Sequence, residues 1–250
     1  MINLVNLIKK QYFTSRKTRP KILKKSHKYY ILRILRVLKT GLSWRNLECK
    51  NIHYTTIHKF YRKLVKLNVF KNVYMKLLQK HCKSYRSKYY FIDSTLNLNF
   101  YGIDNISRSY LNKKKNYTKL SVIVNDQGIP SNIYLCEAKK HDAITVHNTI
   151  ENGLFLKNNY LIGDKGYISP DVKNNLQISR NITMVYPYKK NQKKKNTLIE
   201  KQLLNKRHIV ENFFSWLKKS KRVCQRYDKT TESYYGFIYL KCSQIIINKL

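Results

Sequence analysis

The sequence predicts an α/β fold preceded by a small, basic, all-α domain. Two changes along the 250 residues indicate this. Apolar residues keep helical spacing up to about residue 87, and from residue 88 onward strand-like runs alternate with helical ones. Charge changes as well, because residues 1–88 hold 24 Lys and Arg while Glu48 is the only acid before Asp93. We therefore expect a basic helical domain over residues 1–87 and an α/β domain over residues 88–250.

The charge of the chain indicates a polyanionic partner. It has 51 Lys and Arg against 13 Asp and Glu, a formal net charge of +38. So large an excess repels itself in a compact state unless a polyanion compensates it, and nucleic acid is the obvious candidate. An anionic membrane surface is the alternative, but no segment approaches the roughly 18 uninterrupted apolar residues of a spanning helix.

The cysteines and the N-terminal residues indicate the cellular compartment in which the protein is expected. The five cysteines are odd in number, widely spaced and without a Cys-x-x-Cys pair, which is typical of a reducing compartment. The run from Ile2 to Ile8 is too short for a signal peptide and lacks a basic start. We expect an intracellular protein that is located with the DNA.

The first domain is predicted to be of helix-turn-helix type. Apolar residues at helical spacing indicate helices over residues 31–38, 57–64 and 70–78, and Thr40-Gly41 is a good signal for the end of the first. Ser43 can cap a further short helix. The alternative is a basic bundle that reads no sequence. The side chains predicted to contact DNA here are Arg45, Lys59, Arg62 and Lys63.

The second domain shows an ordered series of strands and helices. Strands are expected at residues 89–92, 119–124 and 131–136, the last two joined by a hairpin turn at 125–130. A helix follows with Asp142 as its N-cap, then a strand at 159–162, a helix after Ser169-Pro170, a strand at 183–186, and a long helix over 198–221. This order resembles the RNase H-like fold, with a mixed five-stranded sheet flanked by helices.

Two acids follow strands in this series. Asp93 ends the first apolar run, and Asp164 follows the fourth, between Gly163 and Gly166, which permit a tight turn. An acid after a strand is often a turn or cap residue, and this alternative stays open for each acid taken alone. The ends of strands are also where open α/β sheets place ligands. Lys165, next to the second acid, is placed to contact a phosphate.

A third acid lies on the long helix. Arg207, Glu211 and Lys218 fall on one helical stripe beside the apolar Val210, Phe213 and Leu217. Glu211 is therefore expected at the margin between core and solvent, although a plain surface network of charges is the alternative. Three carboxylates from two strand ends and one helix suit two-metal phosphoryl chemistry, in which Mg²⁺ takes oxygen ligands and keeps waters.

These motifs together resemble the DDE-type transposases of insertion sequences, especially insertion-sequence family five. The resemblance runs from about Gly41 to the C-terminus. It rests on Gly-Leu-Ser-Trp-Arg-Asn-Leu (41–47), Ile-Asp-Ser-Thr (92–95), Asn-Asp-Gln-Gly-Ile-Pro (125–130), His-Asp (141–142), Gly-Asp-Lys-Gly-Tyr (163–167), Arg-His-Ile-Val-Glu-Asn-Phe-Phe-Ser-Trp-Leu-Lys (207–218) and Arg-Tyr-Asp-Lys (226–229).

The resemblance implies a catalytic, metal-binding triad of Asp93, Asp164 and Glu211 that uses two Mg²⁺ or Mn²⁺ ions. It also implies that Arg207 and Lys218 handle DNA phosphates as an Arg-x3-Glu-x6-Lys signature, in which Leu204 replaces the related tyrosine. The expected partner is double-stranded DNA, both the element's inverted repeats and the target, bound by a homo-oligomer that cuts and joins strands. The alternatives are an inactive or domesticated DNA-binding protein and an RNase H-fold nuclease without strand transfer.

Overall fold

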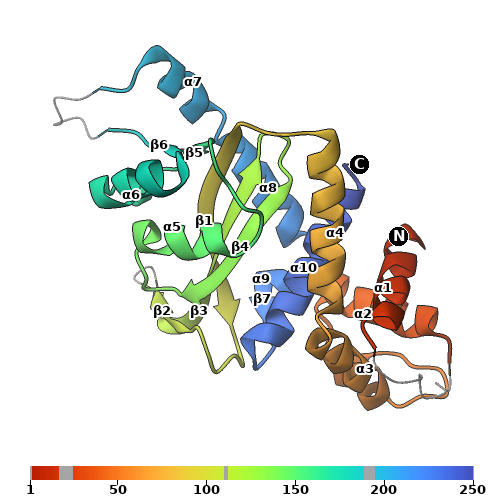
Figure 1. Ribbon diagram of the computed structural model, residues 1–250. Helices are drawn as coiled ribbons and strands as arrows, with labels where there is room; N and C mark the ends of the chain where they lie inside the picture. Colours follow the sequence, from red (N-terminus) through yellow and green to blue (C-terminus); the bar gives the residue numbers. More distant parts are fainter. Residues whose placement is uncertain (1, 17–24, 110–111, 189–194, 250) are drawn as a thin grey trace. The chain divides into compact units, whose positions relative to one another are not determined.

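A computed structural model describes residues 2–16, 25–109, 112–188 and 195–249 (Figure 1). The chain forms two compact units. Unit 1 takes in the described residues up to His81, together with Phe100–Asp104 and the chain from Leu217 on. Unit 2 holds Cys82–Asn99 and Asn105–Trp216. The C-terminal residues, which the sequence places after the α/β core, thus share a unit with the N-terminal helices.

Unit 1 is helical at its N-terminal end. Its elements there are α1 (Ile2–Thr14), α2 (His27–Thr40), the short 3₁₀ helix η1 (Trp44–Asn46), α3 (Tyr54–Lys66) and α4 (Val69–Ser84). Gly41 ends α2 with a φ of 70°, a left-handed conformation that glycine adopts without strain. Ser43 caps η1 by accepting a hydrogen bond from the Asn46 N–H. Both terminal signals expected from the sequence are confirmed.

The C-terminal part of unit 1 adds α9 (Lys221–Cys224), the short strand β7 (Gln225–Arg226) and α10 (Thr231–Ile247). Helix α10 packs on α3, with the rings of Tyr61 and Phe237 stacked at 4.5 Å between centroids. Buried residues occur all around α10, so its sequence lacks the one-sided apolar pattern of a surface helix. This helix therefore has no periodic signal in the sequence.

Unit 2 is built on a mixed sheet. Its strands are β1 (Tyr89–Asn99), β2 (Ser107–Ser109), β3 (Asn112–Asn125), β4 (Pro130–Glu137), β5 (Tyr160–Ile162) and β6 (Thr183–Val185). Along the order β2-β3-β1-β5-β6, β3 runs antiparallel to β1, while β5 runs parallel to β1 and β6 parallel to β5; β4 pairs antiparallel with β3. The five expected strands are present, and β2 is an additional one.

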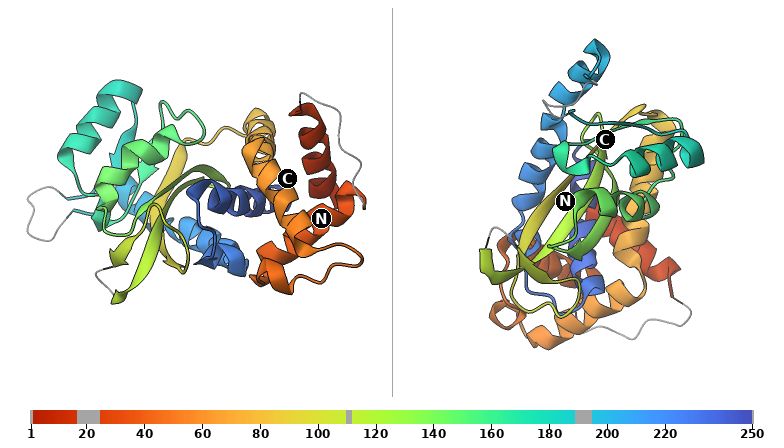
Figure 2. Two further views of the ribbon diagram at one scale, coloured as in Figure 1. Left: turned by 90° about the horizontal axis from the view of Figure 1, so that it is seen from below. Right: turned by 90° about the vertical axis from the view of Figure 1, so that its left-hand side faces the viewer.

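Helices lie on both sides of this sheet. On one side α5 (Asp142–Glu151) packs on β3 and β4, and α6 (Pro170–Arg180) packs on β6 and on α5. After α7 (Leu198–Asn205), α8 (His208–Lys218) lies on the other side (Figure 2). The apolar stripe expected on α8 is confirmed, because Val210, Phe213 and Leu217 are buried. In the part of the chain that the structure describes, no helix is long and apolar enough to cross a membrane.

Three local predictions are corrected. Strand β1 does not end at Asp93 but continues to Asn99, because its backbone keeps pairing with β3 from Asp93↔Val122 to Leu98↔Tyr117. The expected helix over 198–221 is broken between α7 and α8, where successive N–H groups, including that of Arg207, donate three residues back. The N-cap of α5 is His141 rather than Asp142, since the His141 ring accepts from the Ala143 N–H.

Candidate active site

Asp93 occupies the middle of β1, half-buried on the sheet. The Ser94 N–H donates to its Oδ1 at 2.8 Å. The pKa of Asp93 is raised to about 6, chiefly by burial; the carboxylates of Asp164 and Asp142 also raise it, while the Ser94 N–H and the Arg207 guanidinium act in the opposite direction. The raised pKa means that the surroundings disfavour the ionised form of Asp93. A cation bound beside the carboxylate would offset its negative charge.

The parallel pairing of two strands brings Asp164 close to Asp93. Phe91 of β1 pairs with Ile162 of β5, so each acid follows its paired residue by two positions. Asp164 is the N-cap of the 3₁₀ helix η2 (Lys165–Tyr167), and its Oδ1 accepts from the Gly166 N–H at 2.8 Å. The tight turn expected after this strand is present, and it holds the carboxylate in one orientation.

A third carboxylate, that of Asp142, belongs to the same group. Its Oδ1 accepts from the Ser94 hydroxyl at 2.8 Å and from the Lys119 ammonium at 3.0 Å. A Cβ on Gly166 would lie 3.0 Å from Oδ1 of Asp164 and 3.2 Å from Oδ2 of Asp142, so both acids flank this glycine. A larger residue here would press on both carboxylates, which would have to shift by a few tenths of an ångström.

Sequence reasoning missed this role of Asp142, which it treated as a helix cap. The available signal was Lys119, a lysine at the start of the apolar run Leu-Ser-Val-Ile-Val. Its side chain is only 9% exposed, and an ammonium buried in a sheet requires a charged or carbonyl partner. Lys119 finds both, in Asp142 and in the Lys140 carbonyl.

The remaining predicted residues of this domain lie around the acids to different extents. Arg207 is half-buried between α7 and α8, and its charge lowers the pKa of Asp93, so it is near that acid. Glu211 is exposed in the first turn of α8. Lys165 and Lys218 are also exposed. The structure therefore brings Asp93, Asp164, Asp142 and Arg207 together and leaves Glu211 at the surface.

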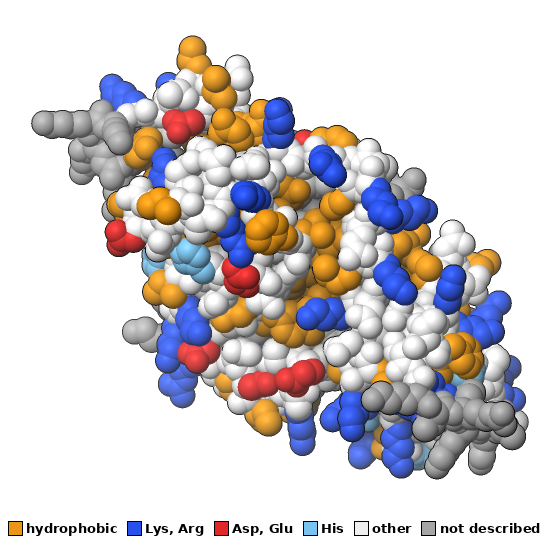
Figure 3. Space-filling view, in the orientation of Figure 1, with side chains coloured by type: hydrophobic (Ala, Val, Ile, Leu, Met, Phe, Trp, Pro, Cys, Tyr) orange, Lys and Arg blue, Asp and Glu red, His pale blue; other side chains and the backbone are white. Residues whose placement is uncertain are grey.

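The basic residues predicted in the N-terminal helices share one property, exposure. Lys59, Arg62 and Lys63 are exposed on α3, opposite the buried Ile57, Phe60 and Leu64, and Arg45 is exposed in η1. Lys and Arg side chains are spread over the face shown in Figure 3, and acidic side chains are few there. This face of α3 can follow a phosphate backbone without removing a side chain from the core.

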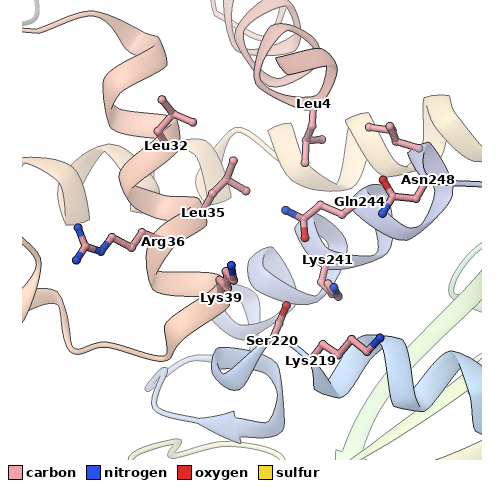
Figure 4. A pocket seen from close by; sticks show the side chains of 11 residues that line it. Leu4, Leu32, Leu35, Arg36, Lys39, Lys219, Ser220, Lys241, Gln244 and Asn248 are labelled. Atoms are coloured by element: carbon pink, nitrogen blue, oxygen red, sulfur yellow. The ribbon is translucent and has the colours of Figure 1, made fainter. Parts of the chain in front are cut away.

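Unit 1 also contains a pocket of about 470 Å³, which none of the predicted site residues lines (Figure 4). Arg36, Lys39, Lys219 and Lys241 surround it, together with leucines from α1 and α2. Burial lowers the pKa of Lys241, and the neighbouring Lys219 adds to this. The pocket is lined by cationic side chains, and none of the acids of unit 2 lines it.

Two of the acids suit a divalent metal ion. Mg²⁺ takes oxygen ligands, keeps several waters and needs only one or two carboxylates, so Asp93 and Asp164 fit one such ion. Within the described ranges, no group of three or more His, Cys, Asp and Glu side chains is placed to hold a metal ion. Glu211, exposed in the first turn of α8, is not part of such a group.

Comparisons with known proteins indicate a class of protein for this chain. Residues 116–231, just under half of the chain, match a family model described as a transposase DDE domain. This segment includes Asp142, Asp164 and Glu211 but begins after Asp93. Among solved structures, a piggyBac transposase synaptic complex with hairpin DNA is similar, with a TM-score of 0.52 and 11% sequence identity over 98% of this chain and 72% of that one. No curated protein sequence matches the chain.

The family match supports a DDE transposase enzyme, as the sequence predicts. The likeness to the piggyBac structure shows a shared mixed α/β fold. DDE transposases generally use divalent metal ions, which agrees with the fit of Asp93 and Asp164 to such an ion.

Proposed function

We propose that this chain is a transposase of insertion-sequence family five that binds the terminal inverted repeats of its element and catalyses DNA strand cleavage and strand transfer. The observation that carries the proposal is the convergence of Asp93, Asp164 and Arg207 at the parallel pair β1 and β5. The strand order β4-β3-β1-β5-β6, with two antiparallel and two parallel pairings, supports an RNase H-like catalytic domain.

In this proposal each residue has a role. Asp93 and Asp164 hold Mg²⁺ or Mn²⁺, and Glu211 completes a set of three ligands for two ions when α8 presents it to the site. The ions supply activation of the attacking water or 3′-hydroxyl and stabilisation of the departing oxygen. Arg207, beside Asp93, pairs with a phosphate oxygen, and Lys165 and Lys218 contact the backbone of the DNA.

The domain roles follow from the same residues. We assign DNA binding to residues 1–87, where the exposed cations of α3 and η1 lie, and catalysis to residues 88–250. Helix α10 packs on α3, so the C-terminal end of the catalytic region shares a core with the DNA-binding helices. A homo-oligomer is proposed because two element ends must be held together for joining.

The test is nicking of a labelled inverted-repeat end in Mg²⁺ by Asp93→Asn, Asp164→Asn and Glu211→Gln. Loss of a metal ligand should lower each rate to below about one hundredth of wild type, with binding to the end retained. Asp171→Asn, an exposed acid in the first turn of α6, is the matched control and should cut normally.

The outcomes separate the alternatives. A variant that retains nicking removes that residue from the triad. Cutting without strand transfer by the wild-type protein would indicate a nuclease, and binding without cutting would indicate a domesticated DNA-binding protein.

A further inference from the structure

The motif Arg226-Tyr227-Asp228-Lys229 has no place among the acids of unit 2, and its contacts in unit 1 are of another kind. Arg226 is fully buried, and its Nη1 donates to the Asp104 carbonyl at 2.8 Å while Nη2 pairs with the Asp104 carboxylate. The Asp228 carboxylate accepts from Arg222 at 3.1 and 3.2 Å, with both side chains buried. Arg226 and Asp228 therefore have structural roles.

The structural role is to hold the loop Phe100–Asp104. The Phe100 N–H donates to the Arg226 carbonyl at 2.9 Å, and the Ile103 N–H donates to the Lys229 carbonyl at 3.0 Å. The Thr231 N–H donates to the Asp104 carboxylate at 3.0 Å. These bonds fix the loop at both ends, although it is neither helix nor strand.

The fixed loop presents large apolar side chains to solvent. Phe100, Tyr101 and Ile103 are 48%, 62% and 73% exposed. Each of these side chains would gain free energy on burial, and the fixed backbone of the loop leaves them in solvent instead. Exposure of three of them on a loop of fixed geometry indicates a contact surface.

The rings form an ordered stack. The guanidinium of Arg222 lies 5.2 Å from the centroid of the Tyr227 ring. Tyr227 lies in turn against Phe100, with centroids 4.8 Å apart and planes only 3° from parallel. Tyr101 adjoins Tyr227 at 6.2 Å. The stack thus runs from a buried cation through Tyr227 to the phenyl ring of Phe100, which is 48% exposed.

We propose that Phe100, Tyr101 and Tyr227 form a platform on which an unpaired nucleobase of the DNA stacks during strand cleavage or joining. This inference rests on the proposed function. Two observations select a nucleobase as the occupant. The Phe100 and Tyr227 rings are stacked in parallel, which is the geometry that bases bind, and the exposed Lys229 beside Ile103 supplies a cation for the adjoining phosphate. A duplex keeps its bases stacked internally, so the platform favours single-stranded or opened DNA.

The experiment compares the affinities of the full-length protein for a single-stranded oligonucleotide and for a duplex of equal length, by fluorescence anisotropy without divalent metal. Phe100→Ala combined with Tyr101→Ala should weaken single-strand binding about fivefold to a hundredfold, the range for losing one stacked base. Duplex binding should change less than twofold. Phe100→Trp preserves a flat ring and should keep single-strand affinity.

The matched control is Phe155→Ala. Phe155 is also 73% exposed and has a guanidinium, that of Arg180, over its ring, but it lies in unit 2. It should leave both affinities unchanged. Thermal unfolding of each variant confirms that the platform residues are changed without loss of the fold.

Three results would overturn the platform. They are unchanged single-strand affinity in the double variant, equal losses for single strand and duplex, and a change confined to self-association of the DNA-free protein in sedimentation equilibrium. Failure of the proposed function gives different results. Nicking would then be insensitive to the triad variants, or the wild-type protein would bind neither single-stranded nor duplex DNA.

Discussion

Asp142 is the residue whose surroundings differ most from those that its sequence position suggests. As the first residue of α5 it suits the helix dipole, yet its Oδ1 also accepts from Ser94 and Lys119. It connects three elements, β1, β3 and α5, beside Asp93 and Asp164. We consider it a structural support for the acids, because its contacts fix the position of β1 relative to α5.

Replacing this carboxylate tests that support. Asp142→Ala removes the carboxylate partner of the largely buried Lys119 ammonium, which keeps its hydrogen bond to the Lys140 carbonyl, and should lower the free energy of unfolding by about 3 kcal/mol. Urea denaturation measures the loss.

The control is a double-mutant cycle with Lys119→Met, which removes the charge that Asp142 compensates. The double variant should be more stable than Asp142→Ala alone, because no unpaired ammonium remains. Strictly additive losses would show that the pair does not interact energetically.

At the residue scale, Asp93 and Asp164 could be predicted from the sequence as candidate site residues, because each follows a run of apolar, β-prone residues. Their closeness depends on the pairing of Phe91 with Ile162, a contact that no local pattern reveals. Lys119 and Asp142 were missed for the same reason, since their partnership joins positions 23 residues apart.

Among the elements, hydrophobic periodicity predicted those that bury one face. It did not predict elements that are buried all around or that continue by backbone pairing. Helix α3 has its buried residues on one stripe and was expected nearly as it stands. Helix α10 is buried all around and was not expected. Strand β1 was expected to end at Asp93, because the apolar run stops there and two hydroxyl residues, Ser94 and Thr95, follow. The backbone groups of these residues nevertheless continue the ladder with β3.

The packing of α10 on α3 depends on a glycine. A Cβ on Gly236 would lie 2.7 Å from the Tyr61 hydroxyl and 2.9 Å from Cγ2 of Val65, both on α3. Alanine favours a helix by about 1 kcal/mol over glycine, but overpacking a core costs about 1–3 kcal/mol. Gly236→Ala should therefore lower the thermal midpoint of unfolding.

A second variant isolates the cause. Tyr61→Phe removes the hydroxyl that the new methyl group meets, although it also removes the hydrogen bond from that hydroxyl to the Ser233 carbonyl. Gly236→Ala should cost less in the Tyr61→Phe background than in wild type. An equal cost in both backgrounds would place the strain elsewhere, at Val65 or in the backbone.

For the whole molecule, the dominant property is a formal net charge of +38. Thirteen acids cannot neutralise 51 basic residues, and the buried acids are already engaged, as Asp228 is with Arg222. The cations that remain at the surface need an external polyanion to lower their mutual repulsion. The charge alone does not tell which of them contact it, and the family match does not reach the N-terminal helices.

The salt dependence of DNA binding gives that information. Each phosphate contact contributes about −0.9 to the slope of log K against log salt concentration for duplex DNA. Replacing Lys59, Arg62 and Lys63 together by Gln should make the slope shallower by up to about 2.7, because all three are exposed on one side of α3. Lys157→Gln, an exposed lysine of unit 2, is the matched single-charge control and should change the slope by less than 0.9. If the α3 variant keeps the wild-type slope, the phosphate backbone follows another surface, and the assignment of DNA binding to residues 1–87 is lost while that of catalysis to Asp93 and Asp164 is unaffected.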